Sequence, residues 1–155
     1  MDTGAMIKRI QEMRDEGYLS DAILRETVKK LKLADTDFNF VGVYLMKSDE
    51  PTLWLHNYMG DPTEHALIPV GTGVCGTAVA ERRNQNVGDV STVENYLACS
   101  PKTKSELVVL IRAGDEIFGQ IDIDARTRDA FPPETQEAIE MVADKLAEVF
   151  MAEKR

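Results

Sequence analysis

The chain has 155 residues, of which 43% are hydrophobic and 29% charged, and its formal net charge is −9 at pH 7. This length and composition predict one globular domain over residues 1–155, and an acidic balance without a dense cationic patch argues against nucleic-acid binding. The sequence contains no apolar run that spans a bilayer and no secretory signal, so we expect a cytoplasmic protein whose two cysteines are thiols rather than a disulfide.

Two amphipathic helices are expected at the start of the chain. Residues 4–16 carry hydrophobic side chains at helical spacing, and Gly17 ends the segment. Residues 20–33 repeat the pattern more clearly, with Ser20 placed to cap the helix.

The pattern then changes to strands. Residues 38–46 and 52–58 are rich in aromatic and β-branched side chains and are separated by turn-forming residues, which predicts a hairpin. A short strand is expected at 67–70. The glycines of 71–76 then form a tight turn into a helix at 77–83.

A long loop and a second hairpin follow. Residues 84–105 form a loop with a brief strand near Val87, and loops of this length inside a compact domain are usually functional. Residues 106–112 are almost uniformly apolar, as in a strand buried on both faces, whereas residues 117–124 alternate in polarity. We expect these two strands to pair through a loop at 113–115.

The last helix begins at Pro132 and Pro133, and its apolar residues share one stripe. Helices at both ends of a meandering set of strands, with one helix between strands, predict an antiparallel sheet with helices packed against it.

Three acidic residues near the second hairpin are candidates for chemistry. Asp122 and Asp124 point to one face of their strand, with about 7 Å between their Cα atoms. A three-residue loop would place Glu106 opposite Asp122 on that face, whereas a two-residue loop would send it to the other face; we predict three. Clustered carboxylates repel, so one would have a raised pKa and donate a proton, while the others hold an ammonium group. The alternative is a solvated strand end.

The two cysteines are the second candidate feature. Cys75 lies where the glycine-rich turn enters a helix, so we expect free backbone amides to lower its pKa. Cys99 lies in the long loop, with Lys102 and Lys104 nearby to stabilise an anion. The alternative for either cysteine is a small buried hydrophobe.

Metal and phosphate sites are weaker interpretations. A zinc site from His56, His65, Cys75 and Cys99 is conceivable, but the spacings match no usual zinc pattern, so we predict no metal and no cofactor. Both histidines are otherwise ordinary polar strand residues. The glycines of 71–76 lack the lysine of a phosphate-binding loop.

Four segments with their order and spacing carry a family resemblance: residues 39–44 (NFVGVY), residues 68–78 (IPVGTGVCGTA), Cys99 with Ser105 and Glu106, and residues 121–124 (IDID). As an ordered set they resemble the free methionine-(R)-sulfoxide reductases of the GAF superfamily, from about residue 20 to the C-terminus. The resemblance implies a single GAF-type α/β (α+β) domain. Its antiparallel sheet would carry the terminal helices on one face and the crossover helix and long loop over the other.

The resemblance also implies a reaction and a set of site residues. The cysteine that matches Cys99 attacks the sulfoxide sulfur of free methionine (R)-sulfoxide, in a thiol-dependent reaction without a cofactor. The matching carboxylates bind the substrate and promote protonation of its oxygen. The pocket residues that match are Tyr44 and Phe40, the latter standing where the family commonly has Trp. The residues implied for catalysis are Cys99, Glu106, Asp122 and Asp124.

One departure concerns how the oxidised enzyme is restored. Many family members have a third cysteine that resolves the oxidised nucleophile, and the aligned position here is His65. The resemblance therefore points to the subgroup without that cysteine. A sulfenic acid at Cys99 would then condense with Cys75 or with an external thiol such as thioredoxin.

Two other functions remain as alternatives. A non-catalytic GAF sensor would bind a small ligand and signal through its helices. A purely structural or regulatory dimer would use the amphipathic terminal helices, and we expect a homodimer in any case because GAF domains commonly pair through such helices.

Overall fold

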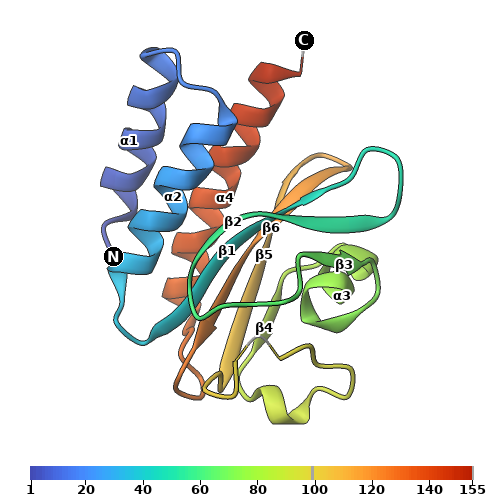
Figure 1. Ribbon diagram of the computed structural model, residues 1–155. Coiled ribbons are helices and arrows are strands. Elements are labelled where there is room, and N and C mark those ends of the chain that lie inside the picture. The colour runs from blue at the N-terminus through green and yellow to red at the C-terminus, as the bar shows by residue number, and fades with distance from the viewer. Residues whose placement is uncertain (99, 155) are drawn as a thin grey trace.

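An antiparallel sheet organises the computed structural model, which describes residues 1–98 and 100–154 (Figure 1). Its strands lie in the order β3-β2-β1-β6-β5-β4. The elements in chain order are α1 (Thr3–Asp15), α2 (Ser20–Ala34), β1 (Phe38–Met46), β2 (Thr52–Gly60), β3 (Leu67–Pro69), α3 (Gly73–Glu81), β4 (Gln85–Val87), a 3-10 turn (Val90–Thr92), β5 (Ser105–Ala113), β6 (Glu116–Ala125) and α4 (Pro133–Glu153). Cys99 lies outside the described residues.

Helices α1, α2 and α4 cover one face of the sheet (Figure 1). Alternate residues of the central strands point toward them, among them Val41 on β1, Val109 on β5 and Ile121 on β6. Burying each such aliphatic side chain contributes about 1.5 to 3 kcal/mol. The helices described are not long and apolar enough to cross a membrane.

The opposite face of the sheet packs against α3. Tyr44 on β1 and Val108 on β5 join Val74 and Ala78 of α3 in a second, smaller core. The predicted architecture is therefore confirmed, with the terminal helices on one face and the crossover helix on the other.

Two helix starts differ from the sequence prediction. Ser20 is the first residue of α2 and makes no side-chain cap; its backbone N–H donates instead to the carboxylate of Glu153 in α4. Helix α3 begins at Gly73, so residues 73–76 form its first turn, and only Gly71 and Thr72 of the glycine-rich segment lie before it. A side chain at Gly76 would place its Cβ 2.5 Å from the backbone oxygen of Pro69, and this close packing on β3 explains the glycine.

The turn between β5 and β6 is shorter than predicted. Ala113 pairs with Glu116, so the loop has two residues, Gly114 and Asp115, rather than three. Gly114 has a φ of +58°, which suits the left-handed conformation of such tight hairpin turns. A regular register beyond this turn would send Glu106 to the face covered by the terminal helices.

A β-bulge reverses that outcome. The register shifts because Phe118 is an extra residue on β6: Arg112 pairs with Ile117, but Ile111 pairs with Gly119. Glu106 consequently lies opposite Asp124, not opposite Asp122 as predicted, and on the same face of the sheet as both. The predicted grouping of the acids was right, and the predicted turn was wrong.

Gly119 allows β6 to approach β1 closely. A Cβ at this position would lie 2.1 Å from the backbone oxygen of Tyr44 and 2.9 Å from Cα of Leu45. Because both contacts are with backbone, Gly119→Ala should lower the free energy of unfolding by about 3 kcal/mol or more, measured by urea denaturation.

The matched control for this substitution is Gly4→Ala in α1, where the nearest atom is 3.7 Å from the added Cβ. That variant should be as stable as the parent chain or slightly more stable. Equal stability of the Gly119 and Gly4 variants would contradict the close approach of β1 and β6.

Candidate functional site

Three carboxylic acids lie buried on the face of the sheet that packs against α3. Glu106 is 5% exposed, and Asp122 and Asp124 are each 1% exposed. Glu106 pairs with Asp124 across β5 and β6, and Asp122 follows two residues along the same face. The alternative of a solvated strand end is wrong, because these side chains are enclosed by the fold.

Strand β1 supplies an aromatic wall beside the acids. Phe40 lies opposite Asp124, and Gly42 lies opposite Asp122. A Cβ on Gly42 would lie 2.8 Å from the Phe40 ring, so the ring occupies the space left by the missing side chain. The same ring stacks on Tyr58 of β2, with centroids 5.3 Å apart. The glycine thus lets the fully buried Phe40 lie across the strand next to the carboxylates.

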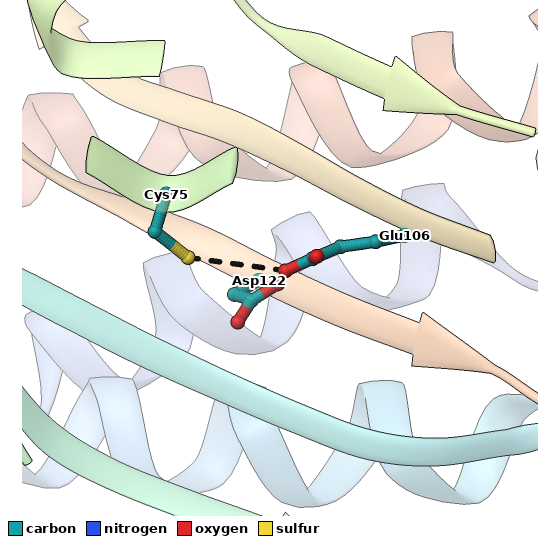
Figure 2. A group of neighbouring side chains, drawn as sticks. All are labelled: Cys75, Glu106 and Asp122. Carbon is teal, nitrogen blue, oxygen red and sulfur yellow. Dashed lines mark hydrogen bonds between the residues drawn. The ribbon is translucent and has the colours of Figure 1, made fainter. Parts of the chain in front are cut away.

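Helix α3 brings Cys75 directly over the acidic cluster (Figure 2). Its thiol donates to Oε2 of Glu106 at 3.9 Å. One ligand atom of each of Cys75, Glu106 and Asp122 lies within 4.8 Å of the others. Figure 2 shows the three side chains converging from α3, β5 and β6. The helix is held in place by Gln120 of β6, whose Nε2 donates to the Cys75 carbonyl at 3.0 Å.

Burial changes the proton affinities of this cluster. Loss of hydration raises the pKa of Asp124 well above its ordinary value, and the neighbouring charge of Asp122 raises it further. Burial also raises the pKa of Asp122, although hydrogen bonds from Glu106 and Cys75 oppose the shift. The cluster therefore retains protons at a pH where exposed carboxyls have lost them.

The expected low pKa of Cys75 is wrong. Burial raises the pKa of this thiol well above its ordinary value, and the charges of Asp122 and Glu106 add to the shift. The position in the first turn of α3 is as predicted, but carboxylates face the sulfur and outweigh the backbone amides of the helix. Cys75 is a buried neutral thiol rather than an activated nucleophile.

The acids have unfilled hydrogen-bonding capacity. Thr103 donates to Oδ2 of Asp124 at 3.5 Å, and Asn39 donates to the Thr103 hydroxyl at 3.0 Å. Oδ1 of Asp122 and Oδ1 of Asp124 are buried without a hydrogen-bond partner. No Lys or Arg occurs among the buried polar residues of the described chain. The site can therefore accept hydrogen bonds from a ligand that carries a positive charge.

A small cavity of about 10 Å³ adjoins the cluster, which is room for about one water molecule. It is lined by Glu106, Asp122 and Cys75 together with Tyr44, His65 and Leu97. Leu97 also packs closely on Gly73, where an added Cβ would lie 3.0 Å from its side chain. The segment that contains Leu97 thus closes one side of the cavity.

The two histidines have different surroundings. His65 lies in the connection between β2 and β3 rather than in a strand, and its carbonyl accepts from the Tyr44 hydroxyl at 2.9 Å. Its Nε2 is 3.2 Å from the carbonyl oxygen of Ala98, which places His65 beside the residue that precedes Cys99 in the chain. His56 instead lies 2.6 Å from Asp21 of α2.

The structure therefore brings together only part of the predicted sets. The zinc set fails as a group because His56 contacts α2, while Cys75 and His65 line the cavity. Phe40, Tyr44 and the three acids share one face, as expected. Sequence reasoning missed Gln120 and Thr103. Gln120, Asp122 and Asp124 are every second residue of β6 and so share one face, which the sequence could have shown. No sequence signal marked Thr103.

Two comparisons with known proteins point to the same family. Residues 20–150 match the GAF domain. The free methionine-R-sulfoxide reductase of Escherichia coli is 35% identical over 114 residues, which cover 74% of this chain and 67% of that protein. This similarity confirms the resemblance that the sequence motifs indicated.

Solved structures of similar fold carry the same name. The reduced form of fRMsr from Staphylococcus aureus is 34% identical with a TM-score of 0.85, and the match covers 96% of this chain and 94% of that one. Free methionine-R-sulfoxide reductase from Neisseria meningitidis, in complex with its substrate, is 28% identical with a TM-score of 0.89; the match covers 98% and 90% of the two chains.

Because the pKa of Asp124 is raised, we expect this residue to make the free energy of unfolding depend on pH. Below the unfolded pKa of about 4 the carboxyl is protonated in both states and costs nothing. As pH rises from there through the raised folded pKa, the unfolded state has released its proton while the folded state still holds one, so stability falls. Asp124→Asn should therefore increase the free energy of unfolding at pH 8 by on the order of 1 to 3 kcal/mol.

The measurement is urea denaturation of both proteins between pH 3 and pH 8. The stability gap should widen with pH and close in acid. If the variant is instead less stable than the parent by the same margin at every pH, the raised pKa of the buried Asp124 is contradicted.

Proposed function

This chain belongs to the GAF domain family, and we propose that it reduces free methionine (R)-sulfoxide to methionine. An oxidoreductase of this kind is indicated by the relatives that carry the name, and one of their structures holds the substrate. The observation that carries the proposal is the burial of Glu106, Asp122 and Asp124 on one face of the sheet, where Oδ1 of Asp122 and Oδ1 of Asp124 have no hydrogen-bond partner among the described residues. Free methionine sulfoxide supplies an ammonium group that such a cluster would hold.

In the proposed reaction the thiolate of Cys99 attacks the sulfoxide sulfur. A sulfoxide oxygen transfers poorly unless it is protonated, and Asp124 retains a proton for this step because burial raises its pKa. The oxygen and that proton end on the Cys99 sulfur as a sulfenic acid, and methionine leaves with the electron pair that the thiolate supplied. Glu106 and Asp122 would hold the ammonium group, while Phe40 and Tyr44 would enclose the methyl sulfoxide.

Substrate entry requires movement of one wall. The cavity of about 10 Å³ holds about one water molecule, which is far less than methionine sulfoxide needs. We propose that the segment with Leu97 and Ala98 moves outward to admit the substrate and then returns. The contact of Ala98 with His65 would hold this segment in the closed state.

The sulfenic acid would be reduced by an external dithiol such as thioredoxin. Attack on a sulfenic acid requires a thiolate, and Cys75 is a buried thiol with a raised pKa beside two acids. A first external thiol would form a mixed disulfide with Cys99 and release water, and the second would release the enzyme. Such recycling fits a reducing cytoplasm.

We further propose that residues 1–155 act as one GAF-type domain that pairs as a homodimer. Hydrophobic side chains remain exposed on the helical layer, including Leu33 of α2 and Met141 of α4. Burying them between two copies would remove apolar surface from water.

The proposed nucleophile is Cys99. With dithiothreitol, the purified protein should consume the R epimer of free methionine sulfoxide and leave the S epimer and peptide-bound forms unchanged. Cys99→Ser should lose at least about a thousandfold in kcat, because a hydroxyl is a far weaker nucleophile than a thiolate.

Chromatographic resolution of the two epimers measures this outcome. Activity that survives in Cys99→Ser but is lost in Cys75→Ser would transfer the role to Cys75. A parent protein that is inactive with both dithiothreitol and thioredoxin, yet binds methionine sulfoxide, would favour the non-catalytic sensor.

The proposed recycling of the oxidised enzyme does not involve Cys75. Cys75→Ser should turn over with thioredoxin within about threefold of the parent rate, because the proposed route uses only external thiols. Mass spectrometry of the oxidised parent should find Cys99 as a sulfenic acid or its trapped adduct. A disulfide between Cys75 and Cys99, together with a large loss of thioredoxin-dependent turnover in Cys75→Ser, would contradict this route.

A further inference from the structure

We propose that Cys75, Glu106 and Asp122 form a binding site for a thiophilic divalent cation, with Zn²⁺ the best fit. One ligand atom from each residue lies within 4.8 Å of the others, and all three side chains are buried. They converge from α3, β5 and β6, so the fold holds the donors together independently of any loop (Figure 2). The cation would compete with a substrate ammonium group for the same acids.

The spacing of the donors suits a small tetrahedral ion. Zinc lies about 2.3 Å from sulfur and about 2.0 Å from carboxylate oxygen, so tetrahedral sulfur and oxygen ligands are roughly 3.5 Å apart. The sulfur of Cys75 and Oε2 of Glu106 are 3.9 Å apart. Small rotations of these side chains would bring them to the bonding distance.

Charge and available space both favour a cation here. Oδ1 of Asp122 is buried without a hydrogen-bond partner, and this residue lines the adjoining cavity. The cavity of about 10 Å³ has room for one water molecule, which would serve as a fourth ligand. His65 lines the same cavity and offers an alternative nitrogen donor. A thiolate with two carboxylates presents three negative charges, and a divalent ion neutralises two of them.

The donor set selects the class of metal. A thiolate ligand favours Zn²⁺ and Co²⁺ over Mg²⁺ and Ca²⁺, which prefer oxygen ligands only. Binding replaces the thiol proton of Cys75, which passes to solvent, and no electron is transferred. Binding itself does not depend on the proposed reductase activity, whereas inhibition of turnover by the metal would.

The test uses Co²⁺ as a spectroscopic probe in the Cys99→Ser variant, whose single remaining thiol is Cys75. One equivalent of Co²⁺ should produce a near-ultraviolet charge-transfer band that reports a cobalt–thiolate bond, and Zn²⁺ should displace it. Adding Cys75→Ser should abolish the band. Adding Asp122→Asn should weaken Co²⁺ binding by at least about tenfold, because it removes one ligand oxygen. Circular dichroism checks that each variant is folded.

His56→Gln in the same background is the matched control, because His56 lies outside the proposed site, with its Nε2 2.6 Å from Oδ1 of Asp21. This variant should keep the full band. Absence of a charge-transfer band in folded Cys99→Ser protein would overturn the site, as would undiminished Co²⁺ binding in the Asp122→Asn variant.

A final titration separates this proposal from the proposed function. Free methionine sulfoxide added to the Co²⁺-loaded Cys99→Ser protein should reduce the band if the substrate ammonium and the metal share Glu106 and Asp122. A charge-transfer band that forms as expected but keeps its intensity when methionine sulfoxide is added would support the metal site and contradict the placement of the substrate. Absence of the cobalt band together with normal reductase activity in the parent protein would contradict the metal site and leave the proposed function standing.

Discussion

Burial of three carboxyl groups on one face of the sheet is the constraint on which the site depends. A charged carboxylate inside a protein is costly unless it meets a proton, a cation or several hydrogen-bond donors. Here α3 excludes water from Glu106, Asp122 and Asp124, while the described chain supplies no buried Lys or Arg. The cluster therefore either keeps protons or binds a positively charged ligand.

Local backbone features place the acids and the aromatic wall together. The bulge at Phe118 returns Glu106 to the face of Asp122 and Asp124, and Gly42 leaves room for the Phe40 ring. Gly76 lets the first turn of α3 lie against β3, which carries Cys75 over the cluster. Each of these features is a local departure from regular packing or pairing, and each one positions a side chain of the site.

The sequence predicted the strands and helices well because their periodicity is strong. Residues 38–46 were expected as a strand and form β1 with those bounds, and the apolar stripe of the last helix is buried. It could not predict the bulge, since Phe118 has no local feature that marks an unpaired residue. Nor could it predict the pKa of Cys75, because the acids that raise it lie 31 and 47 positions further along the chain and meet it only after folding.

We propose above all that the acidic cluster holds the ammonium group of the substrate. The most direct measurement compares kcat/KM for free methionine (R)-sulfoxide with that for 4-(methylsulfinyl)butanoate, which has the same sulfoxide and carboxylate but no amine. Charged hydrogen bonds contribute about 1.5 to 3 kcal/mol each, so we expect a loss of at least about a hundredfold without the amine. Equal values of kcat/KM for the two compounds would contradict it.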